Sequence, residues 1–155
     1  MHRGIGQSQA ASMEVLGPLM QERLEAGQSV RFSPRGVSML PMLRQGRDSV
    51  VLSPLPEQLK RYDIPLYRRA DGSYILHRIV ETGDTFTCLG DNQFVSEPGV
   101  TRAQMIGIVS GFYREDRFHS VTQRSYQLYC RIWYHSRHLR HFLRRAIGWL
   151  RRHLR

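Results

Sequence analysis

Residues 64–80, with the sequence IPLYRRADGSYILHRIV, decide the fold class of this chain. Two runs rich in aliphatic and aromatic residues, Ile64–Arg69 and Ser73–Val80, lie on either side of the dipeptide Asp71-Gly72. Asp-Gly between two such runs is a strong short-range signal for an antiparallel hairpin, because a tight hairpin turn needs residues that accept a positive φ. The sequence therefore predicts a β-hairpin over this stretch.

Similar short runs extend the β pattern in both directions from the hairpin. A polar loop over residues 90–99 separates two of these runs. Strands are expected at residues 29–32, 49–52, 85–89 and 105–113, with 117–121 pairing back on the last of them. Short strands at hairpin spacing favour a closed or half-closed antiparallel β barrel. We therefore expect a mainly β domain over residues 29–121.

Helical patterns flank this β body on both sides. Ser12 is a candidate N-cap for a helix over residues 13–26, which Gly27 ends. From Tyr126 onward, large apolar residues recur on one helical face, and Arg and His fill the rest. The sequence thus predicts a helical segment over 1–28, the β domain, and a long basic amphipathic helix over 122–155.

Composition excludes several classes of protein. The chain has 155 residues, 41% of them apolar and 23% charged, which is typical of one soluble globular domain and excludes disorder, collagen and coiled coil. Two cysteines, Cys88 and Cys130, exclude a disulfide scaffold and a Cys-rich zinc module, and no metal or other cofactor is expected. No continuous apolar segment predicts a membrane span or a secretory signal.

The positive charge is concentrated at the C-terminal end. The net charge is +10, and residues 126–155 hold eight Arg and neither Lys nor an acidic residue, which leaves +2 for the rest. An apolar face with Trp133 and Trp149 beside a cationic face is typical of a helix lying on an anionic membrane surface. We expect peripheral membrane association. The alternative is a tail that only packs on the domain of a cytoplasmic protein. Nucleic acid is not expected, since phosphate binding needs no large apolar face.

Ser38 and His77 are the first candidates for chemistry. Ser38 lies in an apolar turn between Gly36 and Pro41, where its backbone amide could serve as an oxyanion donor. His77 lies in an apolar strand, where a histidine is either a core residue or a general base held in a dry site. A turn serine and a core histidine are the structural alternatives for the two residues.

Two acidic residues are candidates for a third member of the site. A serine–histidine pair needs a group that fixes the imidazole tautomer and stabilises its cationic form. Asp91 and Glu97, in the polar loop that follows the strand at 85–89, could each do this. Asp91 could instead only tighten the Gly90-Asp91-Asn92 turn.

The order of five short motifs resembles that of the type I signal peptidases, which are serine endopeptidases related to self-cleaving phage-type repressors. The match covers about residues 30–113, most of the β body. The motifs in this chain are Gly36-Val37-Ser38-Met39-Leu40-Pro41, Tyr62-Asp63-Ile64, Leu76-His77-Arg78-Ile79-Val80, Gly90-Asp91-Asn92 and Ile106-Gly107-Ile108-Val109. The resemblance implies a signal-peptidase-like antiparallel β barrel with Ser38 as the nucleophile.

Within this family, the resemblance points to the branch similar to the endoplasmic-reticulum enzymes. That branch has histidine followed by arginine where the bacterial branch has its catalytic lysine, and this chain has His77-Arg78. Lys60, the only lysine, lies well before that motif in a polar stretch. The branch places an essential acid a few residues after its Gly-Asp-Asn motif. Glu97 stands there, and either Glu97 or Asp91 would face His77.

The resemblance also implies a substrate and a mode of binding. Gly36 takes the place of a second serine found in many signal peptidases, so the oxyanion hole would rest on backbone amides, notably that of Ser38. A peptide or preprotein would bind extended, beside strands that flank Ser38 and His77, and would be cut after small residues such as Ala. The residues expected to contact it are Gly36, Val37, Met39, Pro41 and Leu76.

Two other functions are open at this stage. The first is a catalytically inactive relative that binds a peptide or a membrane on the same scaffold. The second is a DNA-binding repressor of the related class, which we do not expect because only 35 residues precede the Ser38 motif.

Overall fold

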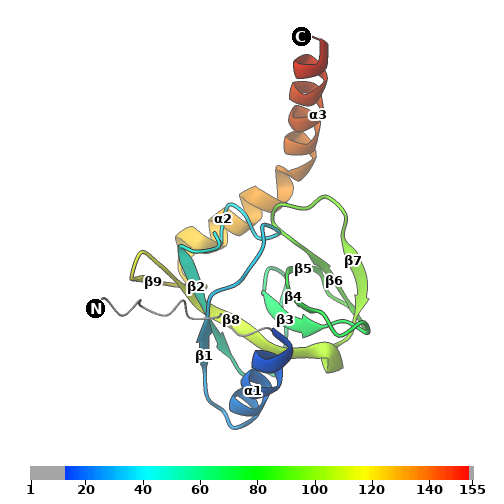
Figure 1. Ribbon diagram of the computed structural model, residues 1–155. Helices are drawn as coiled ribbons and strands as arrows, with labels where there is room; N and C mark the ends of the chain where they lie inside the picture. The colour runs from blue at the N-terminus through cyan, green and yellow to red at the C-terminus, as the bar shows by residue number, and fades with distance from the viewer. Residues whose placement is uncertain (1–12, 154–155) are drawn as a thin grey trace, which may run out of the picture.

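The computed structural model describes residues 13–153. It combines helices with two antiparallel sheets, at 31% helix and 30% strand, and the sheets form no closed barrel in this part of the chain. The expectation of a mainly β barrel is therefore corrected to a mixed fold, with an antiparallel β body between helical ends (Figure 1). Within the described residues the barrel does not close because three of the strands form a separate, smaller sheet, and most strands are only three to six residues long, so strand residues do not outnumber the helical residues.

The larger sheet curves around the main core. Its strands follow the order β1-β2-β8-β3-β4, and β9 pairs with β8. The long strand β8 is central, so β1 and β4 lie at the two edges of the strand order. The bounds are β1 Val30–Phe32, β2 Asp48–Ser53, β3 Pro65–Arg68, β4 Tyr74–Leu76, β8 Met105–Arg114 and β9 Arg117–Ser120. The expected pairing of 117–121 on the preceding strand is confirmed.

The smaller sheet contains β5 Arg78–Glu81, β6 Phe86–Leu89 and β7 Glu97–Val100, in that order. Two sequence predictions are wrong here. The run 73–80 is not one strand, because the chain leaves the larger sheet after Leu76 and enters the smaller one at Arg78, with His77 between them. Residues 90–99 are not all loop, because Glu97 begins β7 and lies opposite Cys88 of β6.

Two apolar clusters stabilise the body. The larger lies inside the curved sheet and contains fully buried side chains such as Val50, Leu52 and Ile64. The smaller surrounds Tyr67 and Ile79, where the two sheets meet. Cys88 and Cys130 are both buried free thiols. His77, between the end of β4 and the start of β5, lies where the two sheets meet.

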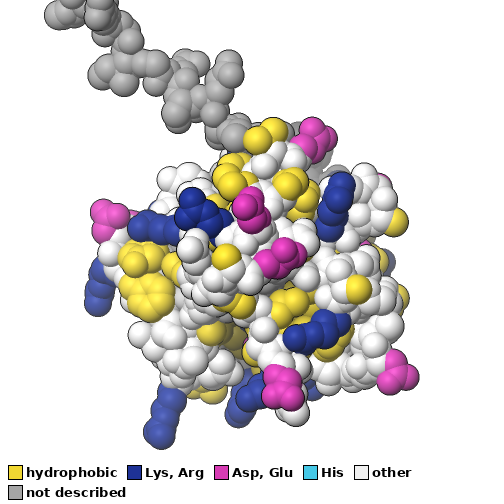
Figure 2. Space-filling view, turned by 90° about the horizontal axis from the view of Figure 1, so that it is seen from below, with side chains coloured by type: hydrophobic (Ala, Val, Ile, Leu, Met, Phe, Trp, Pro, Cys, Tyr) yellow, Lys and Arg dark blue, Asp and Glu magenta, His cyan; other side chains and the backbone are white. Residues whose placement is uncertain are grey.

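Helix α1, Met13–Glu25, packs against the larger sheet at close range. Its bounds agree with the predicted helix at 13–26, and Ser12, the expected N-cap, lies outside the described residues. A methyl group added at Gly17 would lie 2.1 Å from the Tyr74 ring of β4, so any larger residue there would require this ring to move. Seen from below, hydrophobic side chains gather around α1, with charged side chains of both signs scattered between them (Figure 2).

The predicted C-terminal helix is two helices. Helix α2, Arg124–His135, lies across the body, and α3, Arg137–His153, projects away from it (Figure 1). Tyr126 and Cys130 of α2 are buried, whereas Leu128 and Ile132 on its other side are exposed. No helix among residues 13–153 is both long enough and apolar enough to span a membrane.

Candidate functional site

The Ser38 turn is held by hydrogen bonds from two directions. Gly36 takes a φ of +93°, and its N–H donates to the Gln45 side chain at 2.7 Å. From the other direction, the Asn92 N–H donates to the Ser38 carbonyl at 2.8 Å, and the Asn92 amide group donates to the Val37 carbonyl at 3.1 Å. The turn is therefore fixed in place by a residue more than 50 positions away in the sequence.

Gly90 explains why the polar loop can approach the Ser38 turn so closely. A methyl group added at Gly90 would lie 2.7 Å from the Ser38 carbonyl oxygen, well inside van der Waals contact. Gly90 therefore permits the close contact with the Ser38 turn, and Asn92 holds the turn through hydrogen bonds. The Gly90-Asp91-Asn92 motif gives no sign of this role for Gly90 or Asn92, because a sequence motif does not show long-range contacts.

Ser38 and His77 both line one apolar pocket of about 850 Å³. Helix α1 forms one wall through Leu16, Leu19 and Met20, and the edge strands β1 and β4 form others. Among the hydrogen bonds of the described residues there is none between the Ser38 hydroxyl and the His77 ring. The structure thus brings both residues to one pocket without joining them directly, which is common before substrate binds.

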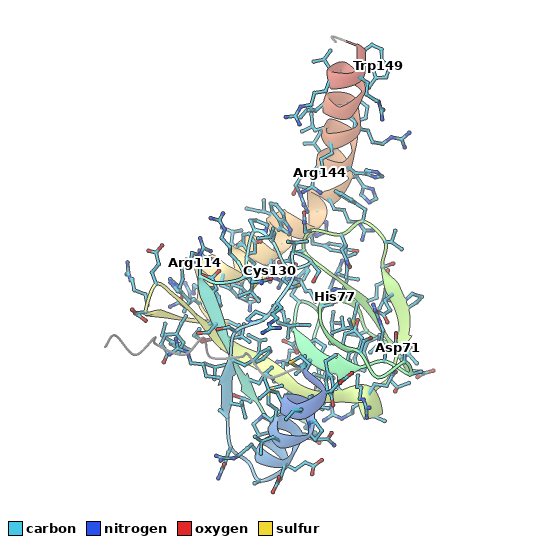
Figure 3. All side chains as sticks on the ribbon, in the orientation of Figure 1. Asp71, His77, Arg114, Cys130, Arg144 and Trp149 are labelled. Atoms are coloured by element: carbon cyan, nitrogen blue, oxygen red, sulfur yellow. The ribbon has the colours of Figure 1, made fainter. Side chains whose placement is uncertain are left out.

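His77 is held neutral by its surroundings. Only 4% of its surface is exposed, and Figure 3 shows it inside the body, far from the outer end of α3. Burial lowers its pKa to about 4, and the negative charge of Glu97 opposes that shift only in part. A neutral imidazole at physiological pH has one nitrogen able to accept a proton, as a general base requires.

Glu97 reaches His77 through Tyr67, a residue that sequence analysis missed. The Tyr67 hydroxyl donates to Glu97 Oε2 at 2.6 Å and lies 3.4 Å from His77 Nδ1. Arg69 binds the same carboxylate with two hydrogen bonds of 2.7 and 2.6 Å. The hydrogen bond from Arg69 lowers the pKa of Glu97, so the carboxylate is charged at neutral pH.

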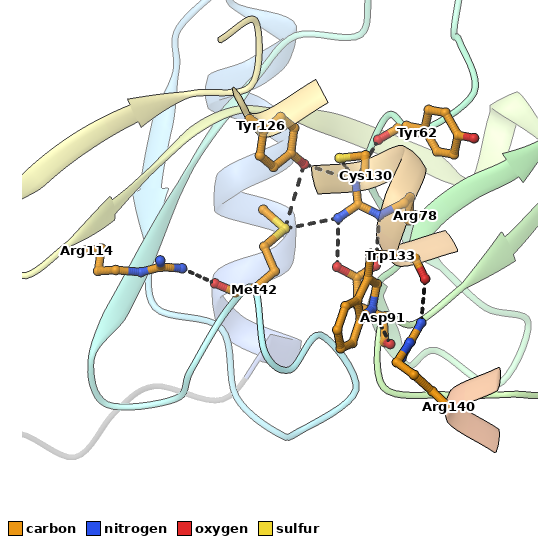
Figure 4. Close-up of polar contacts among 9 residues, drawn as sticks. All are labelled: Met42, Tyr62, Arg78, Asp91, Arg114, Tyr126, Cys130, Trp133 and Arg140. Carbon is orange, nitrogen blue, oxygen red and sulfur yellow. Dashed lines mark hydrogen bonds and ion pairs between the residues drawn. The ribbon is translucent and has the colours of Figure 1, made fainter. Parts of the chain in front are cut away.

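Asp91 is committed to a different partner. Arg78 donates to its two carboxylate oxygens at 2.8 and 2.7 Å, and both side chains are only 3% exposed (Figure 4). Arg78 also donates to the Tyr126 hydroxyl and lies 2.9 Å from the Cys130 sulfur, both on α2. The Arg78–Asp91 pair therefore ties α2 to the β body. Of the two acids left open by the sequence, Glu97 is the one linked to His77.

The predicted substrate contacts divide into two groups. Gly36, Met39 and Leu76 line the pocket with Ser38 and His77. Val37 and Pro41 are not among its lining residues, and Val37 is 63% exposed. Lys60 is exposed and also lies outside the lining.

Among residues 13–153, no cluster of three or more His, Cys, Asp or Glu side chains could hold a metal ion. The Ser38 hydroxyl and the neutral His77 imidazole line the pocket, and the Glu97 carboxylate lies behind His77, outside the lining. Searches of known protein families, curated proteins and solved structures found no match to this chain.

Proposed function

We propose that the chain is a serine endopeptidase of the signal-peptidase type, in its Ser–His form. The observation that carries this proposal is the convergence of Ser38 and His77, from motifs 39 positions apart in sequence, on one apolar pocket. The motif order described above supports it, and so does a histidine kept neutral in a dry site. Ser38 attacks the scissile carbonyl carbon, and His77 takes the hydroxyl proton and passes it to the leaving amine.

The shape of the pocket supports an extended peptide as the substrate. Strands β1 and β4 end the strand order of the larger sheet, and all three residues of each strand line the pocket. A peptide can add to such a free edge through main-chain hydrogen bonds while its side chains enter the apolar pocket. The backbone amide of Ser38 is the proposed oxyanion donor, and cleavage after small residues is expected.

The nucleophile is tested by Ser38→Ala in the full chain, with Ser33→Ala as the matched control. Ser33 also lines the pocket but belongs to no motif. We expect Ser38→Ala to abolish both cleavage of Ala-containing peptides and labelling by a serine-directed acylating probe, and Ser33→Ala to retain both. Both variants remove one small hydroxyl outside the core, so equal melting temperatures are expected. Unlabelled wild-type protein would favour the inactive, peptide-binding alternative.

We also propose that α2 and α3 hold the protein on an anionic membrane surface. Six large apolar side chains of α3, including Phe142, Ile147 and Leu150, are 47–69% exposed. Leu128 and Ile132 of α2 are also exposed, at 58% and 60%. The six arginines of α3 fall on the opposite side of the helix at 100° per residue, with no acidic residue in either helix. This charge pattern complements anionic lipid.

The helix position would also place the active site near the membrane. Arg144 of α3 donates to the Asn92 side chain at 2.7 Å, and Asn92 holds the Ser38 turn. His141 stacks on Phe94 of the same loop, with ring centroids 4.6 Å apart. A peptide emerging at the membrane surface is therefore the proposed substrate class.

Membrane binding is tested by sedimentation with vesicles of phosphatidylglycerol and phosphatidylcholine. The full chain should sediment with anionic vesicles and much less with neutral ones. High salt should weaken binding without abolishing it, since the apolar contribution is not screened. Leu143→Gln with Leu150→Gln should reduce binding, and Val15→Gln, an exposed valine on α1, should not. Preference for duplex DNA over vesicles, or self-association that hides the α3 face, would contradict the proposal.

A further inference from the structure

We infer that Tyr67 is the positioning residue that fixes the His77 tautomer, taking the place of a carboxylate in direct contact with the imidazole. This inference rests on the proposed function for its catalytic meaning, but it is a statement about hydrogen-bond donors that can be measured without activity. Tyr67 lies on β3, is fully buried, and stands between Glu97 and the His77 ring.

A count of protons leads to one arrangement. Arg69 donates to both oxygens of Glu97, which is charged and therefore only accepts hydrogen bonds. The single Tyr67 proton must then point to Glu97, at 2.6 Å. The phenol oxygen has no proton left for His77 and can only accept from it. The Nδ1 atom of His77, 3.4 Å away, therefore carries the ring proton.

This tautomer is the one that the proposed reaction needs. With the proton on Nδ1, the lone pair of Nε2 is free to accept the proton of the Ser38 hydroxyl. The Nδ1 proton stays in place throughout, so no proton crosses Tyr67 to Glu97. The contact of 3.4 Å is longer than an ordinary hydrogen bond, and it would shorten when His77 becomes cationic in the transition state.

The Arg69–Glu97 pair keeps this arrangement in one orientation. Without an ionised Glu97, the Tyr67 hydroxyl could turn its proton toward Nδ1, and His77 would then carry its own proton on Nε2. The negative charge of Glu97 also stabilises the cationic form of the His77 imidazole, although the Tyr67 hydroxyl lies between them. The imidazole stays buried. Arg69, Glu97 and Tyr67 thus act on the reacting serine only through His77.

The test is ¹⁵N-labelled full-length protein observed by NMR at neutral pH, with Tyr67→Phe as the variant. The wild-type His77 should show the Nδ1–H tautomer. Tyr67→Phe removes one oxygen and keeps the ring, and should shift the His77 imidazole toward the Nε2–H form. With a cleavable peptide, kcat should fall roughly tenfold to a hundredfold, a part of what general base catalysis supplies. KM should stay unchanged, because Tyr67 does not line the pocket.

Tyr126→Phe is the matched control. It removes the hydroxyl of another buried tyrosine, 8% exposed, which accepts from Arg78 and does not contact His77, so it controls for the loss of a buried hydrogen bond. Its His77 tautomer and kcat should equal those of the wild type. A wild-type Nε2–H tautomer, or one unchanged by Tyr67→Phe, would overturn the inference. If the tautomer shifts as expected but no peptide is cut by any form, the proposed function fails while the hydrogen-bond assignment stands.

Discussion

Two arginine–carboxylate pairs flank His77, and they differ in what surrounds them. The Arg78–Asp91 pair is almost wholly buried, and its arginine is shared with α2. The Arg69–Glu97 pair is partly exposed, at 38% and 29%, and its carboxylate also accepts from Tyr67. Burial lowers the pKa of His77, and both carboxylates oppose this shift in part, Glu97 more strongly than Asp91. The buried Asp91 therefore stabilises the packing of the fold, and Glu97 is the acid that is linked to His77 in the candidate site.

The largest effect is expected from Asp91→Asn. This change leaves the Arg78 cation buried with no opposite charge, which typically costs about 3–5 kcal/mol. Denaturant unfolding of the full chain should show this loss. Glu97→Gln should cost only about 1 kcal/mol or less, because solvent screens a partly exposed pair. Equal losses in the two variants would remove the distinction between the pairs.

For catalysis, we expect the opposite order of the two variants, with the larger effect from Glu97→Gln. Glu97→Gln should lower kcat on the order of tenfold to a hundredfold, since Tyr67 loses the carboxylate that orients its hydroxyl and His77 loses the nearby negative charge. An Asp91→Asn variant assayed where it is still folded should keep most of the wild-type kcat. Steady-state kinetics on one Ala-containing peptide can compare the two. A loss of kcat confined to the Asp91 variant would show that Asp91, not Glu97, orients His77.

The response to pH tests the environment of His77 itself. Its folded pKa of about 4 lies below the ordinary value of 6.5, so between these values the unfolded chain binds more protons. Stability should therefore fall as the pH drops from 6.5 to 4, by about 3 kcal/mol from this group. Arg69 lowers the pKa of Glu97, so protonation of Glu97 at low pH also reduces the free energy of unfolding. Denaturant unfolding at several pH values, with His77→Gln as the comparison, separates the two.

Activity should follow the same group. A buried histidine with a pKa of about 4 stays neutral through mildly acidic pH, so kcat/KM should begin to fall only near pH 4. The ordinary histidine pKa of about 6.5 would place this limb near pH 6–7, and burial accounts for the difference. An acid limb near pH 6.5 would show that His77 is more exposed to water during turnover than in this structure.

Local patterns predicted much of the secondary structure, because strand and helix periodicity are written in neighbouring residues. The hairpin around Asp71-Gly72 is confirmed by the pairing of β3 with β4, and the helix predicted at 13–26 is confirmed as α1, Met13–Glu25. The break at His77 was not predictable, because residues 74–80 contain no Gly, Pro, Asn or Asp to indicate that the chain changes sheets. Strand β7 was missed because Pro98 and Gly99 are poor strand formers and pairing with β6 overrides that preference.

The candidate site shows the same division between local and long-range information. Ser38 and His77 could be chosen from their unusual local settings, and the structure brings both to one pocket. The choice between Asp91 and Glu97 depended on which arginine reaches each acid, which spacing does not reveal. Tyr67 gave no signal, because a tyrosine in a buried strand is ordinary until its hydroxyl is seen between Glu97 and His77.

The smallest effect is expected from Lys60→Gln. This variant tests whether His77, and not a lysine, is the general base. If a lysine were the base, neither ion pair beside His77 would matter for catalysis. The Lys60 side chain is exposed and lies outside the pocket lining, and its backbone N–H merely donates to Asp63 at 2.7 Å. Replacing it with glutamine should leave kcat, KM and stability within error of the wild type, as most surface substitutions do. His77→Gln should abolish cleavage under the same conditions. Activity that survives in His77→Gln but vanishes in Lys60→Gln would make lysine the base, and would reduce both arginine–carboxylate pairs to structural roles.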